Sequence, residues 1–239
     1  MFTFVGSNNK KMIKIFIISL LCIVYTAGNI IAQSADNNEF TRILISTDSG
    51  NIRIVLYEET PLHRENFIKL IKEGYYDGQL FHRLIKNFMI QAGDPHSKVA
   101  KSGEVLGQGG PGYTIPAEII PKYFHKKGAL AAARKGDQAN PTKASSGSQF
   151  YIVQGSVITK AQLDLMVESN KHRPFSEAEI AAYTKIGGSP HLDGGYTVFG
   201  EVEEGFEVLE KLMQVPVDSN NRPVTDISFS ISILEYGNN

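Results

Sequence analysis

Apolar and polar residues alternate with a period of two over many short stretches of this chain, as they do in half-buried β-strands. The turn residues Asp48, Ser49 and Gly50 separate the first two stretches, which therefore predict a hairpin. Short strands between glycine-rich loops favour a mainly-β fold over an alternating α/β sheet. The predicted strands cover residues 42–46, 51–56, two short strands within 80–94 around Lys86-Asn87, 129–133, 150–153, 197–199 and 227–234.

Helical periodicity is confined to a few segments. Thr60 and Pro61 predict the start of a helix, because threonine is a good N-cap and proline suits the first helical position. Gly74 is a natural residue to end that helix. A second helix is predicted over residues 206–213. The first helix should turn an apolar stripe toward the core, made of Leu62, Phe67, Leu70 and Ile71.

Residues 156–189 differ from their surroundings because they predict two amphipathic helices in succession. These helices are expected over residues 159–168 and 176–186, and Pro174 separates them. The segment falls between the predicted strand at 150–153 and the next block of strand residues. We therefore treat it as a helical insertion into a mainly-β domain.

Residues 1–32 have the pattern of a secretory signal. Three lysines precede the apolar run Ile15–Val24, and small and neutral residues follow it as far as Ala32. The apolar run is too short for a comfortable membrane span, although an uncleaved signal anchor is the alternative. Met12 begins a well-formed signal and is an alternative to Met1 as the start of the chain.

The sequence thus predicts a cleaved signal over 1–32, a flexible polar lead-in over 33–40 and one folded domain over 41–239. The mature protein is expected to be exported, either to a periplasm or out of the cell, without a stable membrane span. Cys22 is the only cysteine and lies inside the apolar run, so the mature chain has no thiol for a disulfide or a nucleophile. Leu21 precedes it where lipid attachment needs a small residue, which disfavours lipid anchoring.

Composition excludes several classes of function. The chain of 239 residues has 24 basic and 25 acidic residues, so it lacks the basic excess of a nucleic-acid-binding protein. Residues 107–112 fit G-x-G-x-x-G but lack the preceding strand and following helix of a dinucleotide site. Residues 145–148 lack the frame of a hydrolase elbow. We expect neither a metal nor another cofactor, because ligand spacing is absent among His63, His82, His96, His125, His172 and His191.

One constellation of residues remains. His82 and Arg83 lie in a strand-like run, and residues 88–91 follow closely. On a strand, Phe88 and Ile90 would face one way and Met89 and Gln91 the other. Taken alone, an arginine near a strand is most often solvated and has no catalytic role.

The wider pattern resembles the cyclophilin family of peptidyl-prolyl cis-trans isomerases. The resemblance rests on three blocks in the family's order, and it extends over roughly residues 42–155 and 190–236. The blocks are Phe81-His82-Arg83 with Phe88-Met89-Ile90-Gln91-Ala92-Gly93-Asp94, then Ser146-Gly147-Ser148-Gln149-Phe150-Tyr151-Ile152, then Leu192-Asp193-Gly194-Gly195-Tyr196-Thr197-Val198-Phe199-Gly200.

The resemblance implies a closed eight-stranded antiparallel barrel capped by two helices, with the active site in a groove on its outer surface. It implies that Arg83 is the catalytic donor and that Gln91 holds its guanidinium group. The main chain near Arg134 would pair with the residue before proline. The other substrate-binding positions implied by the resemblance are His82, Phe88, Met89, Gln149, Tyr151, Leu192 and Tyr196.

Several positions depart from common family members. Tyr151 stands where phenylalanine is usual, Arg134 where asparagine is common, and Tyr196 where histidine is frequent. His191 replaces a tryptophan of cyclosporin-sensitive members, which argues against tight cyclosporin binding. None of these changes removes the residues on which catalysis would depend.

The expected function is isomerisation of X-Pro bonds in exported, unfolded or partly folded proteins, by a monomer. The alternative is a binding module of the same fold that acts as a chaperone or scaffold. Arg83 favours the enzyme, because a binding module has no need of a donor directed at the prolyl nitrogen. The insertion 156–189 is expected to emerge beside the groove, where it either shapes access for client proteins or has no functional part.

Overall fold

The computed structural model describes residues 41–234 and Met1. The predicted signal peptide and lead-in lie outside the described residues, apart from Met1, and so do residues 235–239. Within the described part of the chain, no helix combines the length and apolar character needed to cross a membrane.

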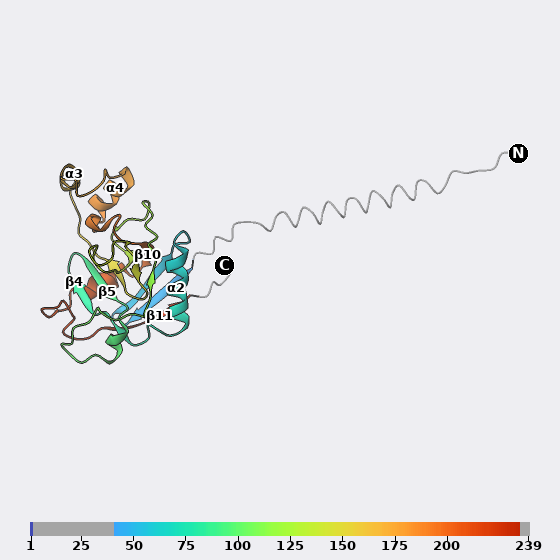
Figure 1. Cartoon of the computed structure of the whole chain (residues 1–239), viewed down its shortest axis with the longest axis vertical. Helices are drawn as coiled ribbons and strands as arrows, with labels where there is room; N and C mark the ends of the chain where they lie inside the picture. The colour runs from blue at the N-terminus through green and yellow to red at the C-terminus, as the bar shows by residue number, and fades with distance from the viewer. Residues whose placement is uncertain (2–40, 235–239) are drawn as a thin grey trace. The chain divides into compact units, whose positions relative to one another are not determined.

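The fold is built on a strongly curled antiparallel sheet (Figure 1). Nine strands are hydrogen-bonded in the order β3-β11-β1-β2-β10-β7-β9-β5-β4, and β6 and β8 form a separate small sheet. The strands are β1 (Arg42–Thr47), β2 (Gly50–Leu56), β3 (Gln79–Leu80), β4 (Arg83–Ile85), β5 (Met89–Ala92), β6 (Thr114–Ile115), β7 (Ala129–Ala132), β8 (Ser145–Ser146), β9 (Phe150–Val153), β10 (Val198–Glu204) and β11 (Ser228–Ile233).

The predicted mainly-β class and the opening hairpin are confirmed. β1 and β2 pair in register from Arg42–Val55 to Thr47–Gly50. Thr47 stabilises the turn, because its hydroxyl donates to the Gly50 carbonyl at 2.9 Å and accepts from the Ser49 amide at 3.1 Å. The alternation of Ile43, Ile45, Ile52 and Ile54 with polar residues therefore produced the structure that its period predicted.

The closed eight-stranded barrel is not confirmed, since the main sheet has nine strands in an open order. Its two edge strands, β3 and β4, are consecutive in the chain and are separated only by Phe81 and His82. β3 pairs only with β11, and β4 pairs only with β5. The interruption at these two residues splits one extended stretch into two short strands, which accounts for the difference.

The curled sheet separates two apolar clusters. Its inner face packs around a large core that includes Ile90, Ala92, Phe150 and Ile152. Its outer face carries a smaller cluster with Met89, Ala129, Ala131, Tyr151, Val153, Leu192 and Val198. Successive residues of β5, β7 and β9 thus alternate between the two clusters, as the strand period requires.

The two predicted helices outside the insertion both contribute to the large core. α2 (Pro61–Lys72) supplies Phe67, Leu70 and Ile71 to this core. α5 (Phe206–Leu212), near the C-terminal end of the domain, supplies Val208, Leu209 and Leu212. Leu62 was expected in the apolar stripe but is exposed, and His63 is buried instead. The helix turns His63 inward because the carboxylate of Glu118 accepts from its backbone amide and its ring.

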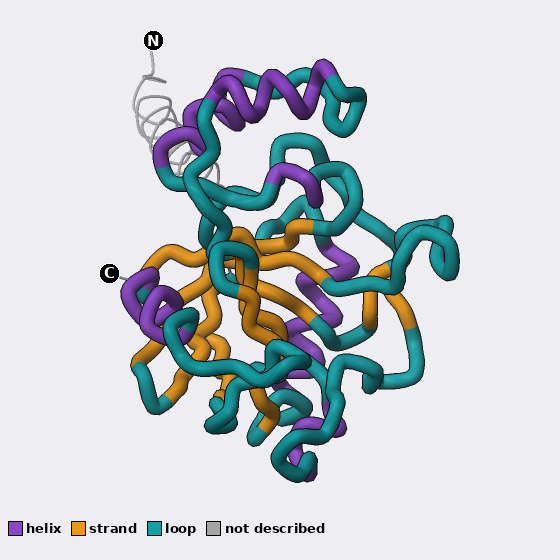
Figure 2. Tube along the Cα trace, turned by 90° about the vertical axis from the view of Figure 1, so that its left-hand side faces the viewer, coloured by secondary structure: helices purple, strands orange, loops and turns teal. Residues whose placement is uncertain are grey.

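The insertion forms the two predicted helices, α3 (Lys160–Glu168) and α4 (Glu177–Lys185), which lie beyond the strands in both Figure 1 and Figure 2. Each helix starts with a complete capping box, with Thr159 paired to Gln162 in α3 and Ser176 paired to Glu179 in α4. Two short 3₁₀ helices, η1 (Pro95–Val99) and η2 (Pro190–Leu192), complete the regular structure.

Glu118 caps α2 in place of the expected Thr60, whose side chain makes no capping bond. The amides of Leu62 and His63 each donate to the Glu118 carboxylate at 3.0 Å. We predict that Glu118→Ala lowers the free energy of unfolding by about 1–3 kcal/mol, because the buried His63 loses the acceptor of its amide and its ring. Urea unfolding of this variant and of Glu65→Ala, an exposed position on the same helix, would test the prediction. Equal stability of the two variants would contradict it.

Candidate active site

A pocket of about 130 Å³ opens on the outer face of the sheet, over β4, β5, β7 and β9. It brings together eight of the ten site residues named from the sequence, although seven of these come from three separate blocks and Arg134 lies outside them. The lining residues are Arg83, Phe88, Met89, Gln91, Ala133, Arg134, Tyr151, Leu192 and Tyr196. Ala133 was not named from the sequence, because its methyl group offers no recognisable chemistry.

Strand register places the central residues of this pocket side by side. Arg83 pairs with Gln91 between β4 and β5, and Gln91 pairs with Tyr151 between β5 and β9. Ala131 of β7 continues the row. Residues directly opposite one another in a sheet share a face, so one row of the sheet carries a cation, an amide and an aromatic ring.

A chain of polar side chains holds the guanidinium group. Arg83 donates from a terminal guanidinium nitrogen to Gln91 Oε1 at 3.2 Å. Gln91 Nε2 donates to Gln149 Oε1 at 2.9 Å, and Gln149 Nε2 donates to the Gly109 carbonyl at 2.7 Å. The three side chains therefore hold one another through neutral acceptors, and no ion pair of Arg83 is found among the described residues.

The floor of the pocket is apolar. Met89, Tyr151 and Leu192 are at most 9% exposed and belong to the outer cluster. Phe88 packs against the same cluster, so it lies with Met89 and not with Ile90 as strand alternation had suggested. The reason is that Phe88 precedes β5 and follows Asn87, whose φ of 62° is left-handed.

Arg134 and Tyr196 form one wall. The Arg134 guanidinium carbon lies 4.5 Å from the centre of the Tyr196 ring, which is a cation–π contact. Arg134 Nε also donates to the Gly195 carbonyl at 2.6 Å. This side chain is thus fixed against the Leu192 block, and its backbone is left at the pocket's edge beside Ala133.

His82 lies outside the 130 Å³ pocket but lines an adjoining cavity of about 270 Å³ that Arg83 and Gln91 also line. Its side chain is buried, and burial lowers the pKa of His82 to about 4. The imidazole is therefore neutral at neutral pH. Gln149 is likewise set back from the pocket, and it reaches the site through Gln91.

The glycine-rich loop does not form a phosphate cradle. The amides of Gly107, Gln108 and Gly109 all donate to Asp94 Oδ2, at 2.6, 3.1 and 3.1 Å. Burial by itself raises the pKa of Asp94, but the amides of Gly109, His96 and Gly107 lower it below its usual range. A buried internal carboxylate thus occupies the anion-binding position, which agrees with the rejection of a nucleotide site.

A serine, a histidine and a glutamate lie in the order of a hydrolytic triad elsewhere in the fold. His63 Nε2 is 2.9 Å from Ser145 Oγ, and His63 Nδ1 is 2.6 Å from Glu118 Oε2. Ser145 is only 1% exposed, and a void lined by His63 measures about 10 Å³. A substrate carbonyl cannot reach this hydroxyl, so the triplet joins α2 to β8 and supports no hydrolysis.

The hydroxyl of Tyr151 does not point at the space where a substrate would lie. It is 3.0 Å from Nε2 of His125, which is buried behind the pocket wall. The ring of Tyr151 therefore presents the same apolar face as the phenylalanine usual at this position. His125 was among the histidines seen in the sequence, but no local pattern connects it with Tyr151.

The sequence is similar to those of known isomerases over most of its length. Residues 42–232 match the family described as cyclophilin type peptidyl-prolyl cis-trans isomerase/CLD. A Staphylococcus saprophyticus protein named as a peptidyl-prolyl cis-trans isomerase is 33% identical over 201 residues, covering 83% of this chain and 94% of that protein. A Streptococcus pyogenes protein named as a bifunctional phosphatase/peptidyl-prolyl cis-trans isomerase is 35% identical over 195 residues, 80% of this chain but only 38% of that protein.

Solved structures give the same result. A crystal structure of a cyclophilin type peptidyl-prolyl cis-trans isomerase from Cryptosporidium parvum matches with a TM-score of 0.61 and 28% identity. The match covers 83% of this chain and 99% of that one. A second crystal structure of that protein, obtained in the presence of the dipeptide Ala-Pro, matches with a TM-score of 0.59.

The buried, neutral His82 makes the stability of the fold depend on pH. The unfolded chain binds a proton at this residue near the ordinary histidine pKa of about 6.5, whereas the folded chain does so only near pH 4. Folding stability should therefore fall as the pH drops through that window. We predict that His82→Gln loses less stability than the wild type between about pH 7 and pH 4.5. Urea unfolding at both pH values would measure this, and identical losses would contradict it.

Proposed function

The chain belongs to the cyclophilin-type peptidyl-prolyl cis-trans isomerases, and on this basis we propose that it acts on exported polypeptides through an active site centred on Arg83. The family implies proline-containing polypeptides as substrates. One structural observation supports the proposal most directly. A guanidinium group, held by Gln91, lies beside an apolar pocket of about 130 Å³.

The reaction needs no nucleophile, because no covalent bond breaks. Resonance in the amide gives peptide bonds a rotation barrier of about 18–20 kcal/mol, and uncatalysed X-Pro exchange takes tens to hundreds of seconds. In the twisted transition state the prolyl nitrogen leaves conjugation and regains its lone pair. A donor placed beside that nitrogen binds the transition state more strongly than either planar ground state.

Arg83 is suited to this role. Arginine stays charged at any physiological pH and presents rigid donors. Gln91 accepts a hydrogen bond from one of these donors and itself donates to Gln149, so the orientation of the guanidinium group is set before substrate arrives. Preorganised donors need no rearrangement when the transition state forms, which is where their catalytic advantage lies.

The apolar residues provide the second requirement, which is to hold the proline ring while the X-Pro bond rotates. Phe88, Met89, Tyr151 and Leu192 are proposed to surround that ring. The backbone near Ala133 and Arg134 is proposed to bind the residue before proline. His82 is proposed to contact the substrate chain in the adjoining cavity that it shares with Arg83.

We further propose that the isomerase assists the folding of exported proteins. The support is the pattern of residues 1–32, in which three lysines, a short apolar run and small residues follow one another. Proline isomerisation is slow enough to limit folding, so an isomerase in the same compartment as newly exported chains would shorten that phase.

The central role of Arg83 leads to a kinetic prediction. Arg83→Ala should lower kcat/KM for a short X-Pro peptide by about 10²–10³, the cost of removing one transition-state donor. Arg83→Lys should also be impaired, because a lysine keeps the charge but cannot reproduce the rigid fork. Line-shape or exchange NMR on residues 33–239 would measure the rates.

Lys86→Ala is the matched control, since Lys86 lies in the turn of the same β4–β5 hairpin and is exposed. It should retain wild-type kinetics. An active Arg83→Ala enzyme would overturn the assignment of the site, and an inactive but folded wild type would favour the binding module.

Export leads to a separate prediction. When the full chain is expressed in a bacterial host, the product recovered outside the cytoplasm should begin near Gln33, and deletion of residues 1–32 should retain the protein in the cytoplasm. Cell fractionation with mass determination would test this. A full-length product in the membrane fraction would instead support the uncleaved signal anchor.

A further inference from the structure

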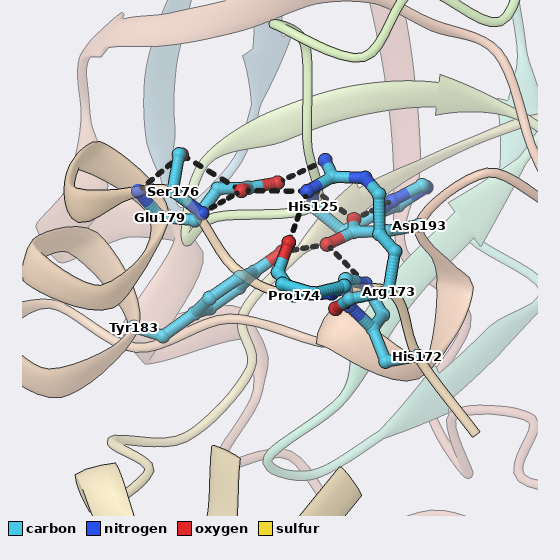
Figure 3. Close-up of polar contacts among 8 residues, drawn as sticks. All are labelled: His125, His172, Arg173, Pro174, Ser176, Glu179, Tyr183 and Asp193. Atoms are coloured by element: carbon cyan, nitrogen blue, oxygen red, sulfur yellow. Dashed lines mark hydrogen bonds and ion pairs between the residues drawn. The ribbon is translucent and has the colours of Figure 1, made fainter. Parts of the chain in front are cut away.

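The insertion is connected to the pocket residue Tyr151 by a chain of buried polar side chains, of which Figure 3 draws Tyr183, Asp193 and His125. The chain begins at Tyr183 in α4 and passes through Asp193 and His125 to the hydroxyl of Tyr151. The residues come from four separate parts of the sequence, and only Tyr151 was expected to be at the site.

Asp193 is the centre of this chain. Its side chain is only 4% exposed. One carboxylate oxygen accepts from the backbone amide of His125 at 2.9 Å and lies 2.8 Å from His125 Nδ1. The other accepts from the Tyr183 hydroxyl at 2.6 Å and lies 3.4 Å from His172 Nε2. Burial by itself raises the pKa of Asp193, but its contacts with His125 and Tyr183 outweigh burial and lower it, so the carboxylate is ionised.

An ionised Asp193 determines which nitrogen of His125 carries the proton. Because the carboxylate can only accept, Nδ1 must donate to it. When the ring carries only this proton, Nε2 is an acceptor, and the Tyr151 hydroxyl, 3.0 Å away, is the donor. His125 is 1% exposed and lies nearly parallel to the Tyr151 ring, at an interplanar angle of 13°. Each hydrogen bond thus has a defined direction from Tyr151 toward Asp193.

The Tyr183 end of this chain of side chains is held by contacts within the insertion and with Phe124. Tyr183 is fully buried and has edge contacts with Phe124 and Phe175. The loop before α4 is closed by Arg173, whose guanidinium binds both carboxylate oxygens of Glu179 at 3.0 and 2.5 Å. With the ring held in this way, the Tyr183 hydroxyl points toward Asp193.

The backbone reinforces the same connection. The Ser189 amide donates to the His125 carbonyl at 2.8 Å, and Gly188 forms bridges with Lys126 and Ser156. A Cβ atom at Gly188 would lie 2.3 Å from the His125 carbonyl oxygen and 2.6 Å from the Tyr183 ring. The backbone at residue 188 can approach His125 and Tyr183 this closely only because glycine has no side chain. Four residues later the same backbone segment reaches the pocket residue Leu192.

From this geometry we infer that Tyr183 is a positioning residue for proline isomerisation, because its hydroxyl orients the Tyr151 ring in the pocket through Asp193 and His125. The inference rests on the proposed function of that pocket. The insertion then supports the active site, and the effect of its Tyr183 hydroxyl reaches the Tyr151 ring through Asp193 and His125. Tyr183 itself touches no part of the site.

A double-mutant cycle on kcat/KM tests the path. Tyr183→Phe keeps the buried ring and should lower kcat/KM about threefold to tenfold, the range expected for one hydrogen bond. In a Tyr151→Phe background the path is already broken, so Tyr183→Phe should change kcat/KM less than twofold. Tyr113→Phe, which removes an exposed hydroxyl bonded to Asn66, is the matched control and should match the wild type.

Two outcomes of the cycle would overturn the inference. One is wild-type kcat/KM in folded Tyr183→Phe. The other is an equal loss in both backgrounds, which would indicate a general structural effect that does not pass through Tyr151. Arg83→Ala measured in the same assay tests the pocket itself, so failure of the proposed function would be seen separately.

NMR spectroscopy tests independently of the kinetics whether the Tyr183 hydroxyl acts on His125 through Asp193. In ¹⁵N-histidine NMR of the full chain, His125 should be protonated at Nδ1, and its Nδ1 and Nε2 shifts should both move in Tyr183→Phe. If that variant fails to fold, Tyr151→Phe should still move the Nε2 shift. An Nε2-protonated His125 in the wild type would overturn the inference.

Discussion

The packing of β5 and β9 into the core decides where the active-site side chains point. Ile90 and Ala92, with Phe150 and Ile152 opposite them, fill the inner face of the sheet. The intervening residues, among them Gln91 and Tyr151, must then face outward. A slip of one residue in either strand would bury Gln91 and expose Ile90, at a large cost in apolar burial. The core therefore specifies the geometry of the candidate site, although none of these four core residues lines the pocket.

The strands and helices could be predicted well because their apolar periods are strong and local. The hairpin, the two capped insertion helices and β9 all lie within a residue or two of their predicted limits. Predictions failed where a single backbone feature overrides the period. Asn87 turns the chain before Phe88, and the break at Phe81 and His82 opens the expected ring of strands. Neither feature changes the spacing of apolar residues, so neither could be predicted from the sequence pattern.

The site was predictable for a different reason. Apart from Arg134, its residues lie in three recognisable blocks, and strand register then places Arg83, Gln91 and Tyr151 in one row. The connection from Tyr183 to Tyr151 was not predictable, because it depends on contacts across sequence separations of 10, 68 and 26 residues. Asp193 lies within a recognised block, but its partners do not. Only tertiary structure shows that this carboxylate accepts hydrogen bonds from both the insertion and the loop that precedes β7.

Carboxylates buried away from the pocket explain why two motifs of other enzyme classes occur here without their chemistry. Asp94 occupies the amides of the glycine loop, and Glu118 holds the histidine beside Ser145. In each case a charge that is costly to bury is satisfied by several directed hydrogen bonds. Asp193 follows the same rule, but with one difference: the last group in its chain is a pocket residue. Because hydrogen bonds are directional and apolar contacts are not, an insertion anchored in this way fixes the orientation of Tyr151 as well as its position. That is the physical reason for our proposal that the insertion positions a residue of the candidate site.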